Sequence, residues 1–326
     1  MDVLPTKRIK TSGIGQGFYF ARILSAGTRF FAVLCLTALL FSCASTRRAP
    51  YTFFTEEKNA YIPVQFGWKA VYEGAEYFCY QNKEFPLRYH CLRINLKADN
   101  LQISAFPATE ADFTHKKGER TKFFTGKRTG KFAKTAGADI AINASPFAGK
   151  NGKWDFLAHI TSTRQLVGIH TVAGRELSPP VSSYCALILR KTGQGWKGEI
   201  IDSQTPESLA DAYFAFGGFW TILRDGQKQG PFINNHDSRT ACGLSQDGHT
   251  LYLLIVEGEA ISMSEGLSYP ECADLLAAMG ADDAMEFDGG GSSSLFIGGK
   301  NMLSYPSIRI NANSIGFSFK SLPNNH

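Results

Sequence analysis

The chain lacks a strong charge bias, internal repeats and a long apolar run. Charged residues make up 19% of the 326 positions, and the net charge is only +5. Part of that excess lies in the first fifty residues, so the charge gives no indication of nucleic-acid binding. The hydrophobic fraction of 44% is ordinary for a globular protein and excludes a disordered chain. The absence of a repeat of about 20 to 50 residues excludes solenoids and propellers.

Cysteine patterns typical of structural zinc are also absent. The chain has seven cysteines, but none has the Cys-x-x-Cys or Cys/His spacing of a zinc site, so we assign no structural metal. Cys79 and Cys91 are spaced for a disulfide-bridged hairpin, which an exported compartment would permit. Buried inert thiols are the alternative for these residues and for Cys185, Cys242 and Cys272.

The one apolar run near the N-terminus, residues 30–41, is too short to span a bilayer. It follows a basic segment and is followed by a small residue and then Cys43, a pattern that resembles a bacterial lipoprotein signal. We therefore predict a signal peptide over residues 1–42, lipidation at Cys43 and a tether over residues 43–60. An ordinary signal peptide and an uncleaved membrane anchor are the alternatives.

Short alternating or apolar runs separated by Gly, Asn, Asp and Pro predict strands through the rest of the chain. They cover residues 68–72, 89–96, 101–106, 140–143, 184–190, 213–216, 241–244, 251–256, 284–287, 294–297 and 314–319.

Helix signals are few. The clearest helix begins at Ser268, which forms a capping box with Glu271, and ends at Gly280; a second precedes Gly137. No linker divides the region. We therefore predict one α+β (mixed α/β) domain over residues 61–320, strand-rich with a few helices packed on the sheet.

The sharpest chemical feature is a run of glycines and serines that directly follows a predicted strand. Glycines permit positive φ and close approach, so consecutive N–H groups can converge on an anion. No lysine follows the glycines, which excludes a nucleotide P-loop, and the G-x-S-x-G pattern is absent. A flexible hairpin loop is the alternative. The run consists of Asp288, Gly289, Gly290, Gly291, Ser292 and Ser293.

Polar residues stand at the ends of other predicted strands. Arg239 precedes one strand, and its planar guanidinium could hold two phosphate oxygens; a surface salt bridge is the alternative. Asn143 ends another strand with an amide that both donates and accepts, although such residues often only form turns. Glu257 closes a third strand. Ligands collect at strand ends in sheets, so we predict that these residues share one site.

Two further carboxylates are candidates for binding substrate. Glu286 alternates to the same face as Asp288 if the segment is extended, which would create a carboxylate pair with one raised pKa. Glu271 is explained by the capping box alone, and substrate binding is its alternative role.

These motifs together resemble the phosphodiester glycosidase family, related to N-acetylglucosamine-1-phosphodiester α-N-acetylglucosaminidase (the uncovering enzyme) and to exopolysaccharide-associated bacterial homologues. The resemblance spans most of the chain beyond residue 60. It is carried by Asn143 with Phe147, Gly217-Gly218, Leu223-Arg224-Asp225-Gly226, Ser238-Arg239-Thr240-Ala241 with Gly243, Gly266-Leu267-Ser268 with Glu271 and Ala273, the Asp288 to Ser293 run, and Arg309 with Asn313 and Gly316.

The chain also departs from the family pattern close to the expected site. Glu257-Gly258-Glu259 stands where the family usually has Asp-Gly-Arg, and Glu286 where it often has Asn. The family's later Asn-Arg-Pro-Ser segment appears here as residues 303–307. These departures leave the substrate open.

The resemblance implies a hydrolase that cleaves a sugar-1-phosphodiester bond in a cell-envelope or extracellular glycan. Because phosphate is a good leaving group, anion stabilisation should outweigh acid catalysis. The residues expected to act in catalysis are Asp288, Glu257 and Arg239. Those expected to bind substrate are Asn143, Gly289, Gly290, Gly291, Ser292, Ser293, Glu286 and Glu271.

We expect no cofactor, although a divalent cation is left open. The expected partners are a glycan or sugar-phosphate substrate and, through the lipid anchor, a membrane; no nucleic acid is expected. One alternative function is a non-catalytic carbohydrate-binding or exopolysaccharide-assembly lipoprotein. Another is a metal-dependent phosphodiesterase in which Asp288, Glu257 and Glu286 ligate the cation.

Overall fold

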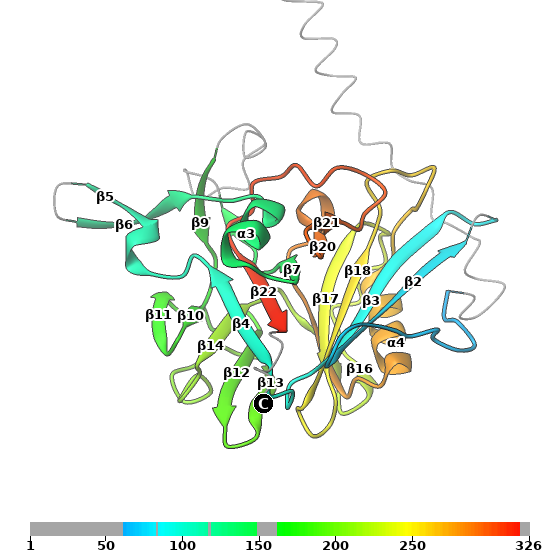
Figure 1. Ribbon diagram of the computed structural model, residues 1–326, viewed down its shortest axis with the longest axis horizontal. Coiled ribbons are helices and arrows are strands. Elements are labelled where there is room, and N and C mark those ends of the chain that lie inside the picture. The colour runs from blue at the N-terminus through cyan, green and yellow to red at the C-terminus, as the bar shows by residue number, and fades with distance from the viewer. Residues whose placement is uncertain (1–60, 83, 117–118, 149–161, 320–326) are drawn as a thin grey trace, which may run out of the picture. The chain divides into compact units, whose positions relative to one another are not determined.

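The structure is a computed structural model that describes residues 61–82, 84–116, 119–148 and 162–319. These residues all belong to the unit Phe54–His326. They form four antiparallel sheets and two α-helices (Figure 1).

The largest sheet has eight strands and carries most of the segments that matter for the site. Its spatial order is β1 (Lys69–Tyr72), β2 (Ala75–Asn82), β3 (Leu87–Asn95), β18 (Thr250–Val256), β17 (Arg239–Leu244), β19 (Asp283–Glu286), β15 (Thr221–Arg224) and β16 (Gln227–Lys228).

Three smaller sheets complete the described part of the chain. The second sheet has the order β11 (Arg175–Ser178), β10 (His170–Val172), β14 (Phe214–Gly217), β12 (Ala186–Thr192) and β13 (Gly195–Ile201). The third has the order β21 (Lys300–Asn301), β20 (Leu295–Ile297), β7 (Ile140–Asn143), β22 (Ser314–Phe319) and β4 (Leu101–Phe106). The fourth has the order β5 (Phe113–Lys116), β6 (Glu119–Thr125), β9 (Thr163–Leu166) and β8 (Phe147–Ala148).

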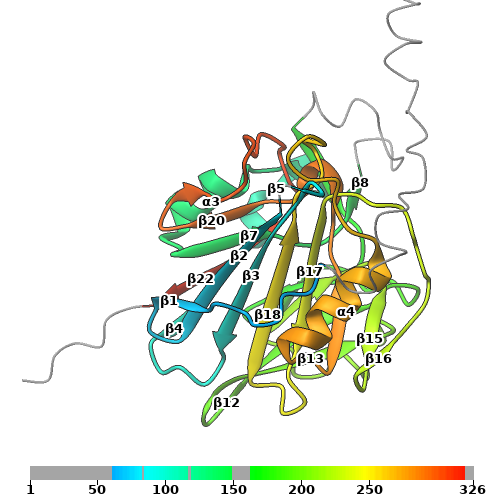
Figure 2. The ribbon, with the colours of Figure 1, turned by 90° about the vertical axis from the view of Figure 1, so that its right-hand side faces the viewer.

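The eight-stranded sheet separates two hydrophobic cores. Alternate side chains of β18 face opposite sides: Leu253 and Ile255 enter the core shared with the other sheets, and Leu254 enters the core beneath helix α4 (Tyr269–Met279). Figures 1 and 2 show α4 lying against one face of this sheet. The other helix, α3 (Thr129–Ala136), packs beside β7, β20 and β22.

Both predicted helices are confirmed. The capping box at the start of α4 is present, because the Ser268 N–H donates to Glu271 Oε2 (2.7 Å) and the Ser268 side chain accepts from the Glu271 N–H. Gly280 ends α4 at φ 110°, and Gly137 ends α3 at φ 63°. In both cases the left-handed backbone that terminates the helix suits glycine.

Each predicted strand is also a strand in the structure, but the predicted fold class is wrong. The described residues are largely β, with two helices, rather than α+β or mixed α/β. The difference comes from segments such as β2 and β13, which pair with their neighbours as hairpins. Side chains of β2 are mostly half-buried, because it lies near the edge of its sheet, so the sequence there shows little alternation.

The predicted hairpin containing Cys79 and Cys91 is confirmed, but the prediction of a disulfide between them is wrong. In the β2–β3 register Cys79 pairs with His90, and Cys91 pairs with Phe78. The two cysteines are therefore one position out of register, and their side chains point to opposite faces of the sheet. All five cysteines among the described residues are free.

The predicted signal peptide, the lipidated Cys43 and the tether lie outside the described residues. Among the residues that are described, no helix is long and apolar enough to cross a membrane.

Candidate active site

Three segments that are distant in sequence meet at the side chain of Asn143. Its Nδ2 donates to the Asp288 carbonyl (2.7 Å), and its Oδ1 accepts from the Thr240 hydroxyl (3.1 Å) and the Ser294 N–H (2.9 Å). The Asp288 N–H in turn donates to the Ala144 carbonyl (2.9 Å). The ends of β7, β17 and β19 thus come together, as expected. Because both ends of its amide bind protein groups, Asn143 orders this junction.

The glycine-rich run forms a tight 3-10 turn, η3 (Gly290–Ser292), that is wedged between two neighbours. A Cβ on Gly289 would lie 2.7 Å from the Ser238 carbonyl oxygen, and one on Gly291 would lie 2.7 Å from Arg309 Nη2. Gly290 has φ +56°, which glycine adopts without strain. The backbone of the turn therefore approaches its neighbours too closely for a side chain at Gly289 or Gly291, as the run of glycines predicts.

One of the three glycine amides is used within the protein. The Gly290 N–H donates to the Ser238 carbonyl (2.8 Å). The N–H groups of Gly289 and Gly291 have no acceptor among the described residues, and both glycines are partly exposed. These two amides are available to an anion.

Two guanidinium groups are near enough to Asp288 for their charges to act on its carboxyl. Burial raises the pKa of its carboxyl to about 6, against the opposing effects of the Ser292 hydroxyl and of the charges of Arg309 and Arg164. Arg309 Nη1 donates to Ser292 Oγ (3.3 Å), and the fully buried Arg164 donates from Nε to the Ile310 carbonyl (2.8 Å). The cations at the glycine turn are therefore Arg309 and Arg164.

Neither arginine is a predicted site residue. Arg309 is part of the family resemblance, and that signal could have identified it. Arg164 lies in the short strand β9 with nothing in the sequence to mark its position beside Asp288.

The guanidinium of Arg239 lies elsewhere, on the α4 side of the sheet. It donates to the carbonyls of Leu267 (2.9 Å) and Asn235 (2.6 Å) and stacks 4.6 Å from the Tyr269 ring centre. Only 7% of Arg239 is exposed. In this arrangement its charge holds the segment that leads into α4.

Glu286 faces the same side as Arg239 and is completely buried. Neither of its carboxylate oxygens has a hydrogen-bond partner among the described residues. Burial raises its pKa to about 7, while the charge of Arg239 and a weaker contact with the Cys272 thiol act in the opposite direction. β19 ends at Glu286, so the strand alternation does not extend to Asp288, and the two carboxyls have different charged neighbours.

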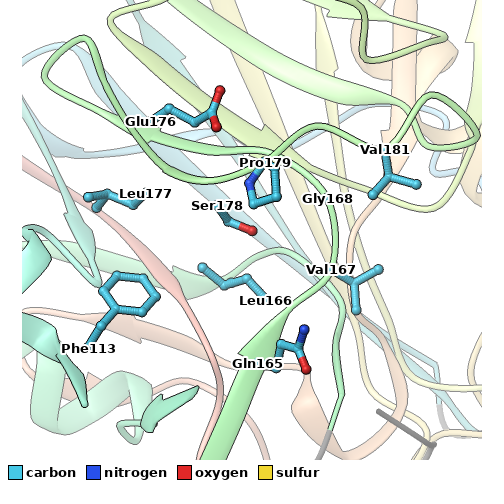
Figure 3. Close-up of a pocket in the computed structure, with 10 residues that line it drawn as sticks. All are labelled: Phe113, Gln165, Leu166, Val167, Gly168, Glu176, Leu177, Ser178, Pro179 and Val181. Carbon is cyan, nitrogen blue, oxygen red and sulfur yellow. The ribbon is translucent and has the colours of Figure 1, made fainter. Parts of the chain in front are cut away.

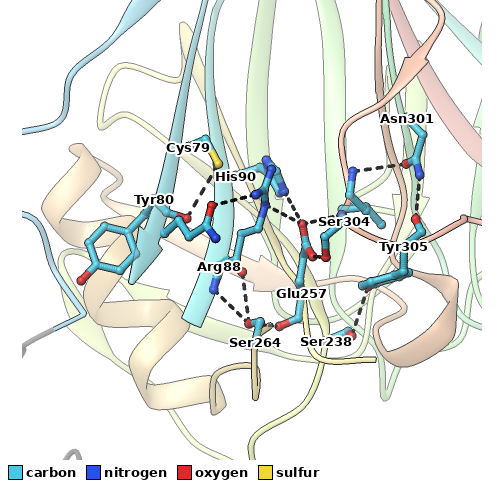
Figure 4. A network of polar contacts seen from close by, with 12 residues as sticks. Cys79, Tyr80, Arg88, His90, Ser238, Glu257, Ser264, Asn301, Ser304 and Tyr305 are labelled. Atoms are coloured by element: carbon cyan, nitrogen blue, oxygen red, sulfur yellow. Dashed lines mark hydrogen bonds and ion pairs between the residues drawn. The ribbon is translucent and has the colours of Figure 1, made fainter. Parts of the chain in front are cut away.

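Glu257 is at the centre of a buried polar network (Figure 4). Its Oε1 accepts from the Ser304 N–H (3.0 Å) and contacts His90 Nε2 (2.8 Å) and Arg88 Nε (3.0 Å), while Oε2 accepts from the Ser304 hydroxyl. Burial alone would raise the pKa of Glu257, but the hydrogen bonds with His90 and Ser304 outweigh it and lower the pKa. Glu257 therefore ties the segment after β21 to the sheet.

This network reaches the glycine turn through the segment that it holds. Tyr305 follows Ser304, and its hydroxyl lies 3.4 Å from Ser238 Oγ. Ser307 Oγ lies 2.8 Å from Ser294 Oγ. The chain that carries Arg309 is thus fastened on both sides of the turn.

Glu271 remains at the helix cap and contacts a histidine. Its Oε2 accepts from Ser268 and lies 2.9 Å from His236 Nε2. Burial would raise the pKa of Glu271, but hydrogen bonds with His236 and Ser268 lower it.

The carboxylates predicted as alternative metal ligands are not gathered into one group. Among the described residues, three carboxylates whose oxygens all lie within 4.8 Å of one another are found at Asp225, Asp282 and Asp283. Asp288, Glu257 and Glu286 form no such group in the described part of the chain.

A cavity of about 410 Å³ lies between β9 and β11, apart from the predicted site residues (Figure 3). Its walls are mainly apolar, with Leu166, Leu177 and Val181, and Gln165 and Glu176 contribute the polar groups.

Comparison with known families settles what the assembled motifs belong to. A family model described as phosphodiester glycosidase matches residues 130–318. The chain belongs to the phosphodiester glycosidase family. The resemblance seen in the sequence motifs is therefore confirmed. The match includes Asn143, Asp288 and Arg309, so the assembled turn lies within the family's own domain.

Solved structures show that this family member shares its fold with distant relatives. One is the catalytic domain of zebrafish N-acetylglucosamine-1-phosphodiester alpha-N-acetylglucosaminidase, auto-inhibited by its pro-peptide (TM-score 0.55, 16% identity, 78% of this chain and 85% of that one). A second is a protein from Synechocystis (TM-score 0.54, 14% identity, 75% of this chain and 62% of that one). A third is a protein from Burkholderia pseudomallei (TM-score 0.52, 13% identity, 71% of this chain and 74% of that one). A search of curated protein sequences found no match.

Proposed function

We propose that this phosphodiester glycosidase-family chain hydrolyses the bond between the anomeric carbon of a sugar and a phosphodiester oxygen. We place the substrate in a cell-envelope or extracellular glycan. The observation that supports the proposal best is the position of Asp288, beside a glycine turn and the charges of Arg309 and Arg164.

The phosphate would bind at the exposed side of the turn. The N–H groups of Gly289 and Gly291 and the guanidinium of Arg309 are the donors that an anion could use there. Arg164 contributes a second positive charge from within the protein. The charges of Arg309 and Arg164 act against the carboxylates of Asp288 and of Glu259, whose Oε1 lies 4.0 Å from a Cβ built on Gly290, and the two guanidinium groups favour a phosphodiester.

Asp288 would activate the water that attacks the sugar. In the proposed step, water oxygen forms a bond to the anomeric carbon as the bond from that carbon to the phosphate oxygen breaks. The leaving phosphate takes the bonding electron pair, and Asp288 takes a proton from the water. Since the phosphate leaves as a stabilised anion, no acid is needed on that side.

The other predicted site residues would act through these groups. We assign Asn143 to ordering the turn, Glu257 to fastening the segment that carries Arg309, and Arg239 to holding the chain before α4. Each assignment follows from the hydrogen bonds that already occupy the side chain.

The test is turnover of an aryl sugar-1-phosphodiester by the purified full-length chain in ¹⁸O-labelled water. We expect the label in the released sugar and none in the phosphate monoester, because the carbon–oxygen bond breaks. Label in the phosphate would instead show attack at phosphorus and support the metal-dependent phosphodiesterase, particularly if a chelator abolished activity. Binding without turnover would favour the non-catalytic alternative.

Two variants locate the activity. Asp288→Asn should lower kcat by about 10²-fold or more, as expected for loss of a general base. Arg309→Met should raise KM strongly, whereas Arg175→Met, at an exposed position in β11, serves as the control and should change neither constant. An Arg309→Met enzyme with wild-type KM would contradict the phosphate-binding role.

We further propose that the chain is an exported lipoprotein of the cell envelope. The support is the short apolar run followed by Cys43 near the N-terminus.

A further inference from the structure

A second, smaller cavity of about 210 Å³ lies at β15, away from the glycine turn. It shares none of its lining with the residues assigned to the phosphate. The lining residues used below are Phe219, Trp220, Thr221, Arg224, Asp202 and Gln229.

One wall of this cavity is aromatic. The rings of Phe219 and Trp220 are stacked, with centres 5.3 Å apart and an angle of 23° between their planes. Trp220 also packs against Tyr269 of α4, which fixes its position. Half-buried aromatic rings at a cavity wall offer apolar contact to the C–H faces of a sugar while leaving its hydroxyl groups free.

The lining also holds a carboxylate that is already oriented. Asp202 Oδ1 accepts from the Thr221 hydroxyl (2.6 Å) and from Arg224 Nη2 (2.6 Å), and Arg224 Nη1 binds Asp283 Oδ2 (2.6 Å). Asp202 Oδ2 has no partner among the described residues. A fixed acceptor of this kind binds a hydroxyl group with little loss of side-chain freedom.

The charge around the cavity disfavours an anion. Arg224 is paired with Asp202 and Asp283, and Asp225 and Asp282 lie next to Asp283. Four carboxylates against one guanidinium leave this region negative. The cavity therefore suits a neutral ligand with hydroxyl groups and repels phosphate.

The backbone links the cavity to the proposed active site. The Phe219 N–H donates to the Glu286 carbonyl (2.8 Å), and the Glu286 N–H donates to the Trp220 carbonyl (3.0 Å). Asp288 is two residues further along the same chain, so its Cα lies within about 7 Å of the Glu286 Cα.

We infer that the cavity between the Phe219–Trp220 pair and Asp202 binds a neutral sugar residue of the glycan. The inference rests on the proposed function, which makes carbohydrate the ligand. The substrate would then be a glycan with at least one uncharged sugar beside its phosphodiester.

Binding of simple methyl glycosides to the full-length chain tests this inference. The panel contains the methyl α-glycosides of glucose, mannose, galactose and N-acetylglucosamine, titrated by calorimetry and by the indole N–H signal of Trp220. The Asp288→Asn background prevents turnover. We expect at least one glycoside to bind at millimolar concentration and to shift the Trp220 signal, and inorganic phosphate not to displace it.

Three variants assign the site. Asp202→Asn and Gln229→Ala should each weaken binding at least threefold while leaving the melting temperature near that of the wild type, since both side chains are largely exposed. Glu199→Gln is the matched control, because Glu199 is also an exposed carboxylate paired with an arginine, and it should bind as the wild type does.

Failure of this inference is distinguishable from failure of the proposed function. No binding by any glycoside, displacement by phosphate, or unchanged binding in both Asp202→Asn and Gln229→Ala would overturn the sugar site. If the enzyme still hydrolysed the aryl phosphodiester, the proposed function would be retained without the sugar site. Glycoside binding in a protein without hydrolytic activity would retain the sugar site and remove the enzymatic proposal.

Discussion

Burial and charge act on Asp288 in opposite directions. Burial raises the pKa of its carboxyl to about 6, although Ser292, Arg309 and Arg164 all favour the ionised form. The carboxylate would otherwise ionise near pH 4 and be too weak a base to take a proton from water. Burial thus brings the pKa of the Asp288 carboxyl closer to neutral pH.

A pH profile follows from this position. If ionised Asp288 is the base, kcat/KM should fall about tenfold per pH unit below a pKa near 6 and should level off above it. Steady-state kinetics on an aryl sugar-1-phosphodiester would measure the curve. An acidic limb that persists unchanged in Asp288→Asn residual activity would assign the titration to another group.

Glu286 shows the cost of burying a carboxyl with little polar compensation. Burial raises its pKa from 4.5 to about 7, so between these values the folded protein binds a proton that the unfolded chain does not. The free energy of unfolding should therefore decrease as the pH rises from 4.5 to 7. The expected loss from this group is about 3 kcal/mol.

Replacement by glutamine isolates that contribution. The difference in unfolding free energy between wild type and Glu286→Gln should change by up to about 3 kcal/mol between pH 4.5 and pH 8, with the variant relatively more stable at the higher pH. Urea unfolding at several pH values gives this quantity. Parallel curves for the two proteins would contradict the raised pKa.

The sequence identified the residues of the site better than their roles. Asn143, Asp288 and the glycines were predicted as neighbours, and they are, because strand ends and turns are visible in a local pattern. The direction of a guanidinium is not local information. Arg239 faces α4 because of the strand's alternation within the complete sheet, and Arg164 approaches Asp288 only through tertiary packing.

Among the elements, the glycine turn allows two substitutions to be compared directly. In Gly289→Ala the new Cβ would meet a backbone oxygen, that of Ser238, at 2.7 Å. In Gly291→Ala it would meet the guanidinium of the long Arg309 side chain, at 2.7 Å from Nη2. Backbone cannot yield as a side-chain terminus can, so the two alanines should have different effects.

We expect Gly289→Ala to lower stability by about 1–3 kcal/mol. Gly291→Ala should keep nearly the wild-type melting temperature and lose kcat/KM, since Arg309 is displaced from the turn. Thermal melts and kinetics on both variants check this. Equal melting temperatures combined with equal activities would contradict the packing described for η3.

Some strands could be predicted from the sequence and others could not. The strands β4, β7 and β22 were predicted with their observed bounds, because alternating or apolar runs bounded by turn residues are a clear signal. β2 was missed, since a half-exposed strand near a sheet edge has a mixed composition. Missing such strands left gaps that made the fold seem richer in helix than it is.

At the scale of the whole molecule, the N-terminal pattern predicts attachment to a membrane. Cys43→Ala should release the protein from the membrane fraction of the producing cells, because lipid chains that contribute roughly 0.8 kcal/mol per buried methylene would no longer be added. Immunoblots of membrane and soluble fractions give the result. A variant that stays with the membrane would indicate an uncleaved anchor instead.

The position of β22 has a consequence for synthesis. This strand is the last described element of the chain, yet it lies between β7 and β4, which are formed from residues far upstream. A ribosome-bound or truncated polypeptide that lacks β22 leaves both partners with an open edge and leaves Asn143 without its supporting neighbour strand. The strand pairing that supports Asn143 therefore forms only after β22 has been synthesised.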